Sequence, residues 1–178
     1  LVEQISSFAK LMRRLVDYSE DYEPLSKEME FVNAYVKLEE FRFKGLFTYE
    51  INMDENSESC MIPKMIVQPI VENACRHGLQ KKSGQRRLKI STSFKDNVLT
   101  ITVADNGTGM DIEKLEQLRN DIKGTEFEGH IGMKNVYRRL KFYFDGKADL
   151  VIDSEEGKGT EIKIIIDYGD DEEETSDV

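Results

Sequence analysis

The helical stretch from Gln68 to Gly78 constrains the fold more than any other feature of the chain, because its two sides have opposite chemistry. At helical spacing, Ile66, Ile70 and Ala74 form an apolar stripe that another layer of structure must cover. Polar side chains gather on the other side, where they need open space. They are Glu72, Asn73, Arg76 and His77. We therefore expect this helix to lie on a sheet, with later loops closing over its polar side.

The polar side of this helix has the residue types of a phosphate-handling site. An Asn oxygen can hold a hydrated Mg²⁺, a Glu carboxylate can activate or orient a nucleophile, and His and Arg can meet phosphate. These properties make Asn73 the candidate metal ligand, Glu72 the candidate catalytic residue, and Arg76 and His77 candidate phosphate-binding residues. An ordinary amphipathic helix with one wet side has the same pattern, so the rest of the chain must decide.

Two amphipathic helices are predicted ahead of this stretch. The first covers residues 1–18, with apolar side chains at i, i+4 and i+7, and it ends before Pro24. The second has Ser26 as its N-cap and a broad apolar stripe that runs to Leu38. The pair either packs on the main core or forms the stem of a helical dimer.

Alternation of apolar and polar residues predicts strands at 47–51, 88–94, 99–103, 148–152 and 160–166. Asp96 and Asn97 are expected to form a hairpin turn between the second and third of these strands. Pro63 is expected to begin the central helix. Pro69, inside that helix, is expected to bend it, because proline removes one backbone donor.

Three glycine-containing segments separate these elements. In the first, Asp105 ends a strand, where its carboxylate can accept from an exocyclic amine, and Gly107 and Gly109 let a flat ring approach the backbone. The second, residues 129–135, opens a helix whose free N–H groups favour an anion. The third is a turn at 155–159. Residues 121–129 lack periodicity and are predicted to form a mobile lid.

Composition excludes some classes of function. A net charge of −10 argues against nucleic-acid binding, which needs a basic surface. Cys60 and Cys75 are too few for a disulfide framework, so thiols in a reducing interior are expected. We expect a soluble chain, because no apolar run reaches the roughly 20 residues that cross a bilayer. The chain begins inside a helical pattern without Met, which suggests a fragment of a longer protein.

The order of the motifs resembles the ATP-binding domain shared by DNA gyrase, the MutL repair proteins, a heat-shock chaperone and sensor histidine kinases, the Bergerat fold. Residues 68–78 look like its N box, and 105–109, 129–133 and 157–160 look like its glycine boxes. Details of 35–43, 68–73 and 129–140 are most similar to the LytS/YesM type of sensor histidine kinase. The implied fold is α+β, a two-layer α/β sandwich with a mixed, mainly antiparallel sheet covered by helices on one face and preceded by N-terminal helices.

The resemblance assigns roles residue by residue. It implies that Asn73 ligates Mg²⁺, that Glu72 polarises or orients the reacting group, and that Asp105 accepts from the adenine amine. The other nucleotide-binding residues that it implies are Arg76, His77, Gly107, Gly109, Gly129, Ile131, Gly132, Met133 and Thr160. The family's phosphorylated histidine is expected on an upstream helix, because His77 and His130, the two histidines here, both fall inside nucleotide boxes.

The implied function is transfer of the γ-phosphoryl group of ATP, with Mg²⁺, to that upstream histidine. A response regulator, the phosphoacceptor helix and a second copy of the kinase are the implied partners, with a membrane anchor elsewhere and a cytoplasmic location here. The alternatives are an ATPase or serine kinase of the same fold, and a nucleotide-responsive interaction module. The expected divisions are a helical segment at 1–44, an ATP-binding domain at 45–168 and a disordered acidic tail at 169–178.

Overall fold

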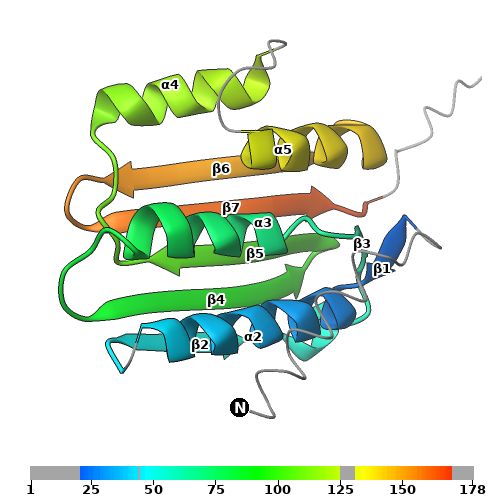
Figure 1. The fold of residues 1–178 in the computed structure, drawn as a ribbon. Coiled ribbons are helices and arrows are strands. Elements are labelled where there is room, and N and C mark those ends of the chain that lie inside the picture. The colour runs from blue at the N-terminus through cyan, green and yellow to red at the C-terminus, as the bar shows by residue number, and fades with distance from the viewer. Residues whose placement is uncertain (1–20, 44, 125–130, 170–178) are drawn as a thin grey trace, which may run out of the picture.

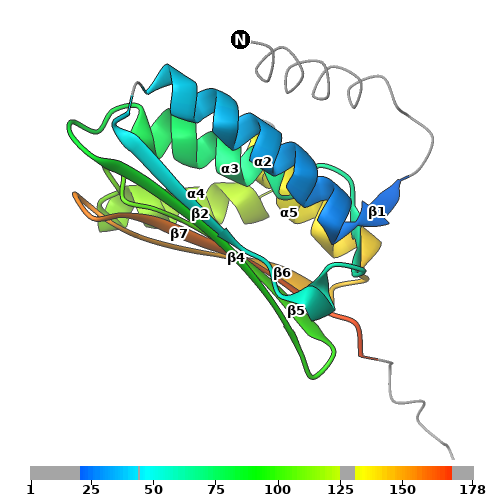
Figure 2. The ribbon, with the colours of Figure 1, turned by 90° about the horizontal axis from the view of Figure 1, so that it is seen from below.

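The computed structural model describes residues 21–43, 45–124 and 131–169, which form two layers. One layer is a five-stranded sheet, and the other consists of helices that all lie on one of its faces (Figures 1 and 2). The helical layer contains α2 (Leu25–Arg42), α3 (Gln68–Asn73) with its π-helical continuation η2 (Ala74–Leu79), α4 (Ile112–Lys123) and α5 (Ile131–Tyr143). A short 3-10 helix, η1 (Glu55–Ser57), follows β2. The sheet strands are β2 (Phe47–Asn52), β4 (Arg86–Lys95), β5 (Val98–Asp105), β6 (Ala148–Glu155) and β7 (Gly159–Asp167).

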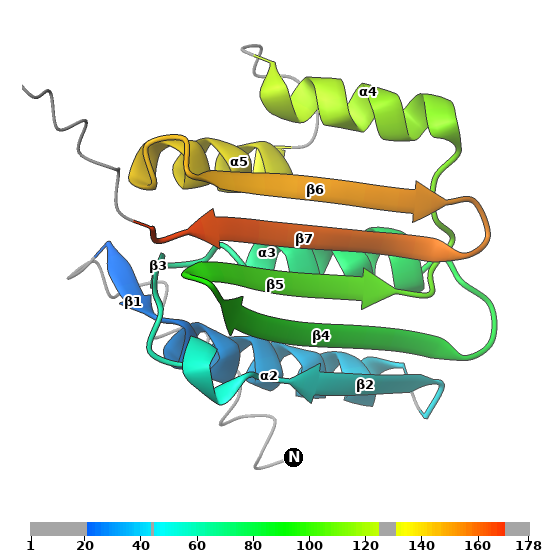
Figure 3. The same ribbon diagram turned by 180° about the vertical axis from the view of Figure 1, so that it is seen from behind.

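The sheet has the order β2-β4-β5-β7-β6, and only its β2–β4 pair is parallel. Alternate side chains of each strand point into the helical layer, as the sequence period of two requires. The buried side chains include Leu88, Ile90, Leu99, Ile101, Val103, Leu150, Ile152, Ile162, Ile164 and Ile166. Figure 3 shows the other face without covering helices. The predicted fold class, with its mixed and mainly antiparallel sheet, is confirmed.

The turn between β4 and β5 also matches its prediction. Asp96 and Asn97 both have left-handed backbone angles, with φ of 51° and 61°, as a two-residue hairpin turn requires. Each predicted strand is present, with ends that extend beyond the apolar alternation. The helix that follows Met110 is α4, whose N-cap Asp111 accepts from the backbone N–H of Lys114 at 2.9 Å.

The start of α2 differs from the expectation. The helix begins at Leu25, and the N–H groups of Leu25 and Ser26 donate to the carbonyls of Cys60 and Glu58, so Ser26 is not the N-cap. Both carbonyls lie just before β3 (Met61–Pro63), which pairs with β1 (Tyr22–Pro24) in a small second sheet. A turn brought close by tertiary structure therefore replaces the local cap.

The two predictions about proline in the central helix were wrong. Pro63 ends β3, and α3 begins five residues later, at Gln68. Pro69 lies in the first turn of α3, where its missing N–H has no helical acceptor to lose, so it starts the helix and does not bend it.

Some predictions fall outside the described residues. These are the first helix, most of the lid at 121–129 and the acidic tail beyond 169; residues 121–123 belong to α4. The division into domains stays a prediction. Cys60 and Cys75 are buried free thiols, and burial raises the pKa of Cys75 to about 12. In the described part of the chain, no helix has the length and apolar character of a membrane span.

Candidate functional site

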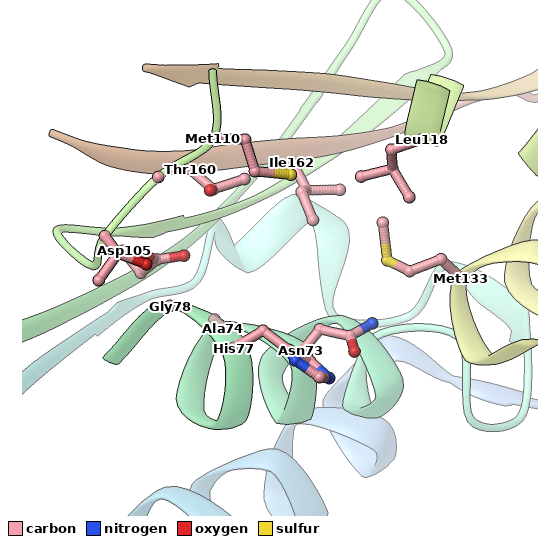
Figure 4. A pocket seen from close by; sticks show the side chains of 12 residues that line it. Asn73, Ala74, His77, Gly78, Asp105, Met110, Leu118, Met133, Thr160 and Ile162 are labelled. Carbon is pink, nitrogen blue, oxygen red and sulfur yellow. The ribbon is translucent and has the colours of Figure 1, made fainter. Parts of the chain in front are cut away.

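A cavity of about 140 Å³ lies between the α3–η2 helix and the sheet, and α4 and α5 complete its wall (Figure 4). Its lining contains six of the predicted site residues. These are Asn73, His77, Asp105, Gly109, Met133 and Thr160. Segments that lie far apart in the sequence thus meet at one site. The remaining lining residues are Ala74, Gly78, Thr108, Met110, Leu118 and Ile162.

The α3–η2 helix forms one side of this cavity, as its amphipathic pattern indicates. Ile70 and Ala74 are buried against the core, whereas Asn73 is half-buried and His77 is exposed. Figure 4 shows Asn73, Ala74, His77 and Gly78 along this helix, across the cavity from Met110 and Ile162. Asn73 and His77 of the predicted polar side therefore line the cavity, and so does Ala74 of the predicted apolar stripe.

Glu72 and Arg76 do not line the cavity. Arg76 is exposed, and Glu72 is half-buried with its Oε1 accepting from Nε2 of Gln68 at 2.9 Å. Gln68 is itself buried. The carboxylate of Glu72 is therefore held from its own helix, next to the cavity and not inside it.

Asp105 lies at the end of β5 with its carboxylate at the edge of the cavity (Figure 4). Its Oδ1 accepts the N–H of Gly107 at 2.7 Å. Burial raises its pKa to about 6, although hydrogen bonds from the backbone of Gly107 and Thr160 oppose that shift. Near neutral pH the side chain is a carboxylate that accepts hydrogen bonds and cannot donate them.

The glycines around Asp105 allow backbones to pack closely. A Cβ on Gly107 would lie 2.5 Å from both Asp105 Oδ1 and the Cα of Gly78, and a Cβ on Gly78 would also lie 2.5 Å from Oδ1. Gly109 has φ of +61°, and a Cβ there would overlap the carbonyl of Glu155. The sequence predicted that Gly107 and Gly109 let a flat ring approach the backbone. The structure adds a second role, because these glycines let the α3–η2 helix, the loop after β5 and the β6–β7 hairpin pack closely.

One hydroxyl connects that loop with that hairpin. Ser154 Oγ accepts the N–H of Met110 at 2.9 Å, donates to the carbonyl of Gly159 at 2.9 Å, and lies 2.9 Å from the hydroxyl of Thr160. A backbone bond from Gly157 to the Thr108 carbonyl, 2.7 Å long, adds a second connection. Sequence reasoning missed Ser154, because a single Ser in a strand has no local signal.

The apolar wall was also missed as a binding surface. Leu118 and Ile162 follow helix and strand periods, so the sequence places them in the core, and Met110 follows the first glycine segment without a site signal of its own. In the structure all three border the cavity with Met133 of α5 (Figure 4). Core periodicity cannot distinguish a side chain that packs on protein from one that packs on a ligand.

The second glycine segment is described only from Ile131, where α5 begins. Met133 is buried and lines the cavity, whereas Gly132 is exposed with open space where a Cβ would lie. Gly129 lies outside the described residues, and so do the surroundings of the Ile131 side chain. The proposed phosphate loop is therefore seen only at its helical end.

The cavity fits a flat base with a polar tail. Apolar side chains can cover the faces of a ring, and the Asp105 carboxylate can accept from an amine at its edge. Asn73 offers an amide oxygen, a ligand type that Mg²⁺ accepts when phosphates and water complete its shell. Within the described residues, no cluster of three or more His, Cys, Asp and Glu side chains forms a metal site. The donor set therefore fits a metal that arrives with a phosphate ligand.

These features define a nucleotide-binding domain built as a two-layer α/β sandwich. The family described as histidine kinase-, DNA gyrase B- and HSP90-like ATPases matches residues 62–170, more than half of the chain. The chain belongs to this family. A second family, described as histidine kinase, matches residues 1–47.

Two named relatives show which type of protein within the family the chain resembles. The chain is 37% identical over 140 residues to the sensor protein LytS of Bacillus subtilis, an alignment that covers 78% of this chain and 23% of that protein. It is 30% identical over 164 residues to the sensor histidine kinase YesM of the same organism, covering 92% of this chain and 27% of that protein. The chain thus spans about a quarter of the length of these relatives. The predicted resemblance to the LytS/YesM type is confirmed.

Solved structures show the same fold. The histidine kinase domain of a blue-light activated kinase from Erythrobacter litoralis superposes with a TM-score of 0.60 at 16% identity, covering 93% of this chain and 73% of that one. The nucleotide-free catalytic domain of the histidine kinase ThkA also has a TM-score of 0.60, at 13% identity, covering 83% and 97%. At these identities the likeness concerns the arrangement of helices and strands.

Proposed function

We propose that this chain is the ATP-binding catalytic part of a sensor histidine kinase and that it transfers the γ-phosphoryl group of ATP to a histidine outside this chain. The observation that carries the proposal is the cavity, which has a carboxylate acceptor at Asp105, apolar walls, and the amide of Asn73 on its helical side. The family matches at 62–170 and 1–47 support the same assignment.

The proposal gives each part of the site one task. Asp105 selects adenine through its amine, and Met110, Leu118 and Ile162 exclude water from the ring. Asn73 holds Mg²⁺, which when bound neutralises phosphate charge, and His77 with Arg76 faces the phosphates. Glu72 orients the acceptor. Phosphoryl transfer needs chiefly positioning and charge neutralisation, and this division of roles supplies both.

The partners of the whole kinase are also proposals. We propose that a helix of the same kinase presents the histidine, that a response regulator receives the phosphoryl group, and that the kinase acts as a homodimer. Anchoring of the whole kinase in the cell membrane, with this part on the cytoplasmic side, belongs to the same proposal. The likeness to the sensor protein LytS and the sensor histidine kinase YesM supports the assignment to a sensor kinase, from which these proposals follow.

The test mixes this chain with the separately produced segment that precedes it and with ATP labelled at the γ-phosphate. Acid-labile label on a histidine of that segment is the expected result, and the Asp105→Asn chain is the matched control that should lose it. Release of free phosphate without labelled protein would instead indicate an ATPase, and label on serine would indicate a serine kinase. Tight binding without turnover would indicate an interaction module.

A further inference from the structure

The beginning of α3 is held by a side chain from another helix. Glu28, in the first turn of α2, is fully buried, with 0% of its surface exposed. Its Oε1 accepts the N–H groups of Val67 and Gln68, each at 3.1 Å, and its Oε2 accepts the N–H of Met65 at 2.8 Å. A buried carboxylate is costly unless it is well paired, and these backbone donors pair it.

This carboxylate completes the hydrogen bonding of the first turn of α3. The N-cap position is Val67, whose side chain has no acceptor, and Pro69 has no N–H. The N–H groups of Ile70 and Val71 both donate to the Val67 carbonyl, at 3.0 and 3.1 Å. Glu28 therefore supplies the cap that the local sequence lacks, and it also fixes Met65, whose φ is +59°.

The contact continues toward the proposed catalytic side chain. Gln68, whose N–H donates to Glu28, donates from its own side chain to Oε1 of Glu72 at 2.9 Å. The opposite end of the α3–η2 helix is attached separately to the loop after β5, because the Gly78 carbonyl accepts the N–H of Thr108 at 3.2 Å. The Asn73 end and the adenine end of the cavity therefore depend on different attachments.

We propose that Glu28 is a positioning residue, which caps α3 from α2 and thereby fixes the positions of Glu72 and Asn73. This inference rests on the proposed function. Glu28→Gln keeps the size of the side chain but places an amide donor among backbone donors. The start of α3 should then shift or fray, whereas Asp105, Met110 and Ile162 remain in place. The variant should therefore lose affinity for the metal and phosphate part of the ligand and keep its affinity for the adenine part.

The experiment measures the affinity of the chain for Mg·ATP and for adenosine by calorimetry. Glu28→Gln should weaken Mg·ATP at least about tenfold, the scale of one hydrogen bond to a charged group, and should change adenosine affinity less than about twofold. Glu23→Gln is the control, because Glu23 is also a buried carboxylate, only 2% exposed, but lies on β1 and pairs with Lys27. It should leave both affinities near those of the unaltered chain.

Several outcomes overturn the inference. One is wild-type affinity for Mg·ATP in a folded Glu28→Gln chain, and another is equal loss of both ligands, which would make Glu28 only a structural residue. Should Glu28→Gln not fold, Glu28→Asp keeps the charge on a shorter arm and must show the same unequal loss, with a smaller amplitude. Failure of the unaltered chain to bind either ligand would instead refute the proposed function.

Discussion

In the proposed function, Asp105 is the residue on which recognition of the adenine base depends most. Replacement by Asn leaves the shape unchanged but places a donor where the adenine amine also donates. We expect Asp105→Asn to lower ATP affinity by about 1.5 to 3 kcal/mol, which is about tenfold to a hundredfold. The fold should remain intact, because burial already disfavours the charged form of this side chain. Calorimetric titration with a parallel melting curve measures both effects.

The control for that variant is Asp153→Asn, which changes an exposed carboxylate on β6 that pairs with Arg119. It should bind ATP as the unaltered chain does. Unchanged ATP affinity in folded Asp105→Asn would remove Asp105 from the site.

If Asp105 binds the base as proposed, its raised pKa should make nucleotide binding depend on pH. Below its pKa of about 6 the carboxyl group is protonated and offers a donor, so ATP affinity should rise between about pH 5 and 7 and level off above. The stability of the free chain should respond in the opposite direction. Because the folded pKa of about 6 lies above the ordinary value of 3.8, the free energy of unfolding should fall as pH rises from 3.8 to about 6 and level off above.

Comparison with Asp105→Asn isolates this effect from the titration of other carboxylates. ATP titrations from about pH 5 to 7 and melting curves from pH 3.8 to about 6 should differ in slope between the two chains. The binding profile of the variant should be the flatter one. Parallel profiles would show that Asp105 does not titrate there or does not meet the ligand.

Asn73 and Glu72 are adjacent in the sequence, but their replacement should have different effects. Asn73 lines the cavity, so Asn73→Ala should remove the enhancement of ATP binding by Mg²⁺. Glu72 is held by Gln68 outside the cavity lining, so Glu72→Ala should bind ATP nearly normally and lose phosphoryl transfer in the longer kinase. ATP titrations with Mg²⁺ and with a chelator, followed by transfer assays, separate the two. Collapse of ATP binding in Glu72→Ala with transfer intact would reverse these roles.

At the scale of elements, the loop after β5 and the β6–β7 hairpin act as one unit through Ser154. Ser154→Ala removes the acceptor of the Met110 N–H and the donor to the Gly159 carbonyl. We expect a loss of stability of about 1 kcal/mol and a loss of ATP affinity of a few fold, because Met110 and Thr160 both line the cavity. Denaturant unfolding and ATP titration provide the two numbers.

Ser93→Ala is a matched change, since Ser93 is a half-buried serine on β4, which does not line the cavity. Equal ATP affinity in Ser154→Ala and Ser93→Ala would show that the loop and the hairpin hold their positions without Ser154.

Elements with a strong local period could be read from the sequence, and elements fixed by tertiary contacts could not. Alternation found β4 and β5, and the Asp96–Asn97 turn followed from residue types that tolerate left-handed angles. The start of α3 was predicted at the wrong residue because its cap is Glu28, which belongs to a helix far away in the sequence. The small β1–β3 sheet was missed because each strand has only three residues, too few for a period.

The candidate site could likewise be predicted only in part from the sequence. Polar residues with a distinctive spacing, such as Asn73, His77 and Asp105, were predicted and meet at one cavity. The apolar wall and the Ser154 connection were not, since their residue types are ordinary for a core and a strand. Glu72 was placed on the right helix, but its support by Gln68 depends on a side-chain contact one turn away.

At the scale of the whole molecule, the sheet brings residues from both halves of the chain to one cavity, and α2 fixes the helix that forms one side of it. A second hollow lies between α2 and the edge strand β2, bordered by Ser26, Asn33 and Tyr49. It provides an internal comparison, because the proposed function requires nucleotide in the first cavity and not in this groove.

The most direct test is a two-dimensional NMR titration of the isotope-labelled chain with Mg·ATP. If the cavity binds nucleotide, the backbone amides of Gly78, Asp105 to Met110 and Ile162 should show large shift changes, and the amides of Ser26, Asn33 and Tyr49 should not change. Saturating ATP that leaves Asp105 to Met110 unshifted, or that shifts only the groove between α2 and β2, would contradict this expectation.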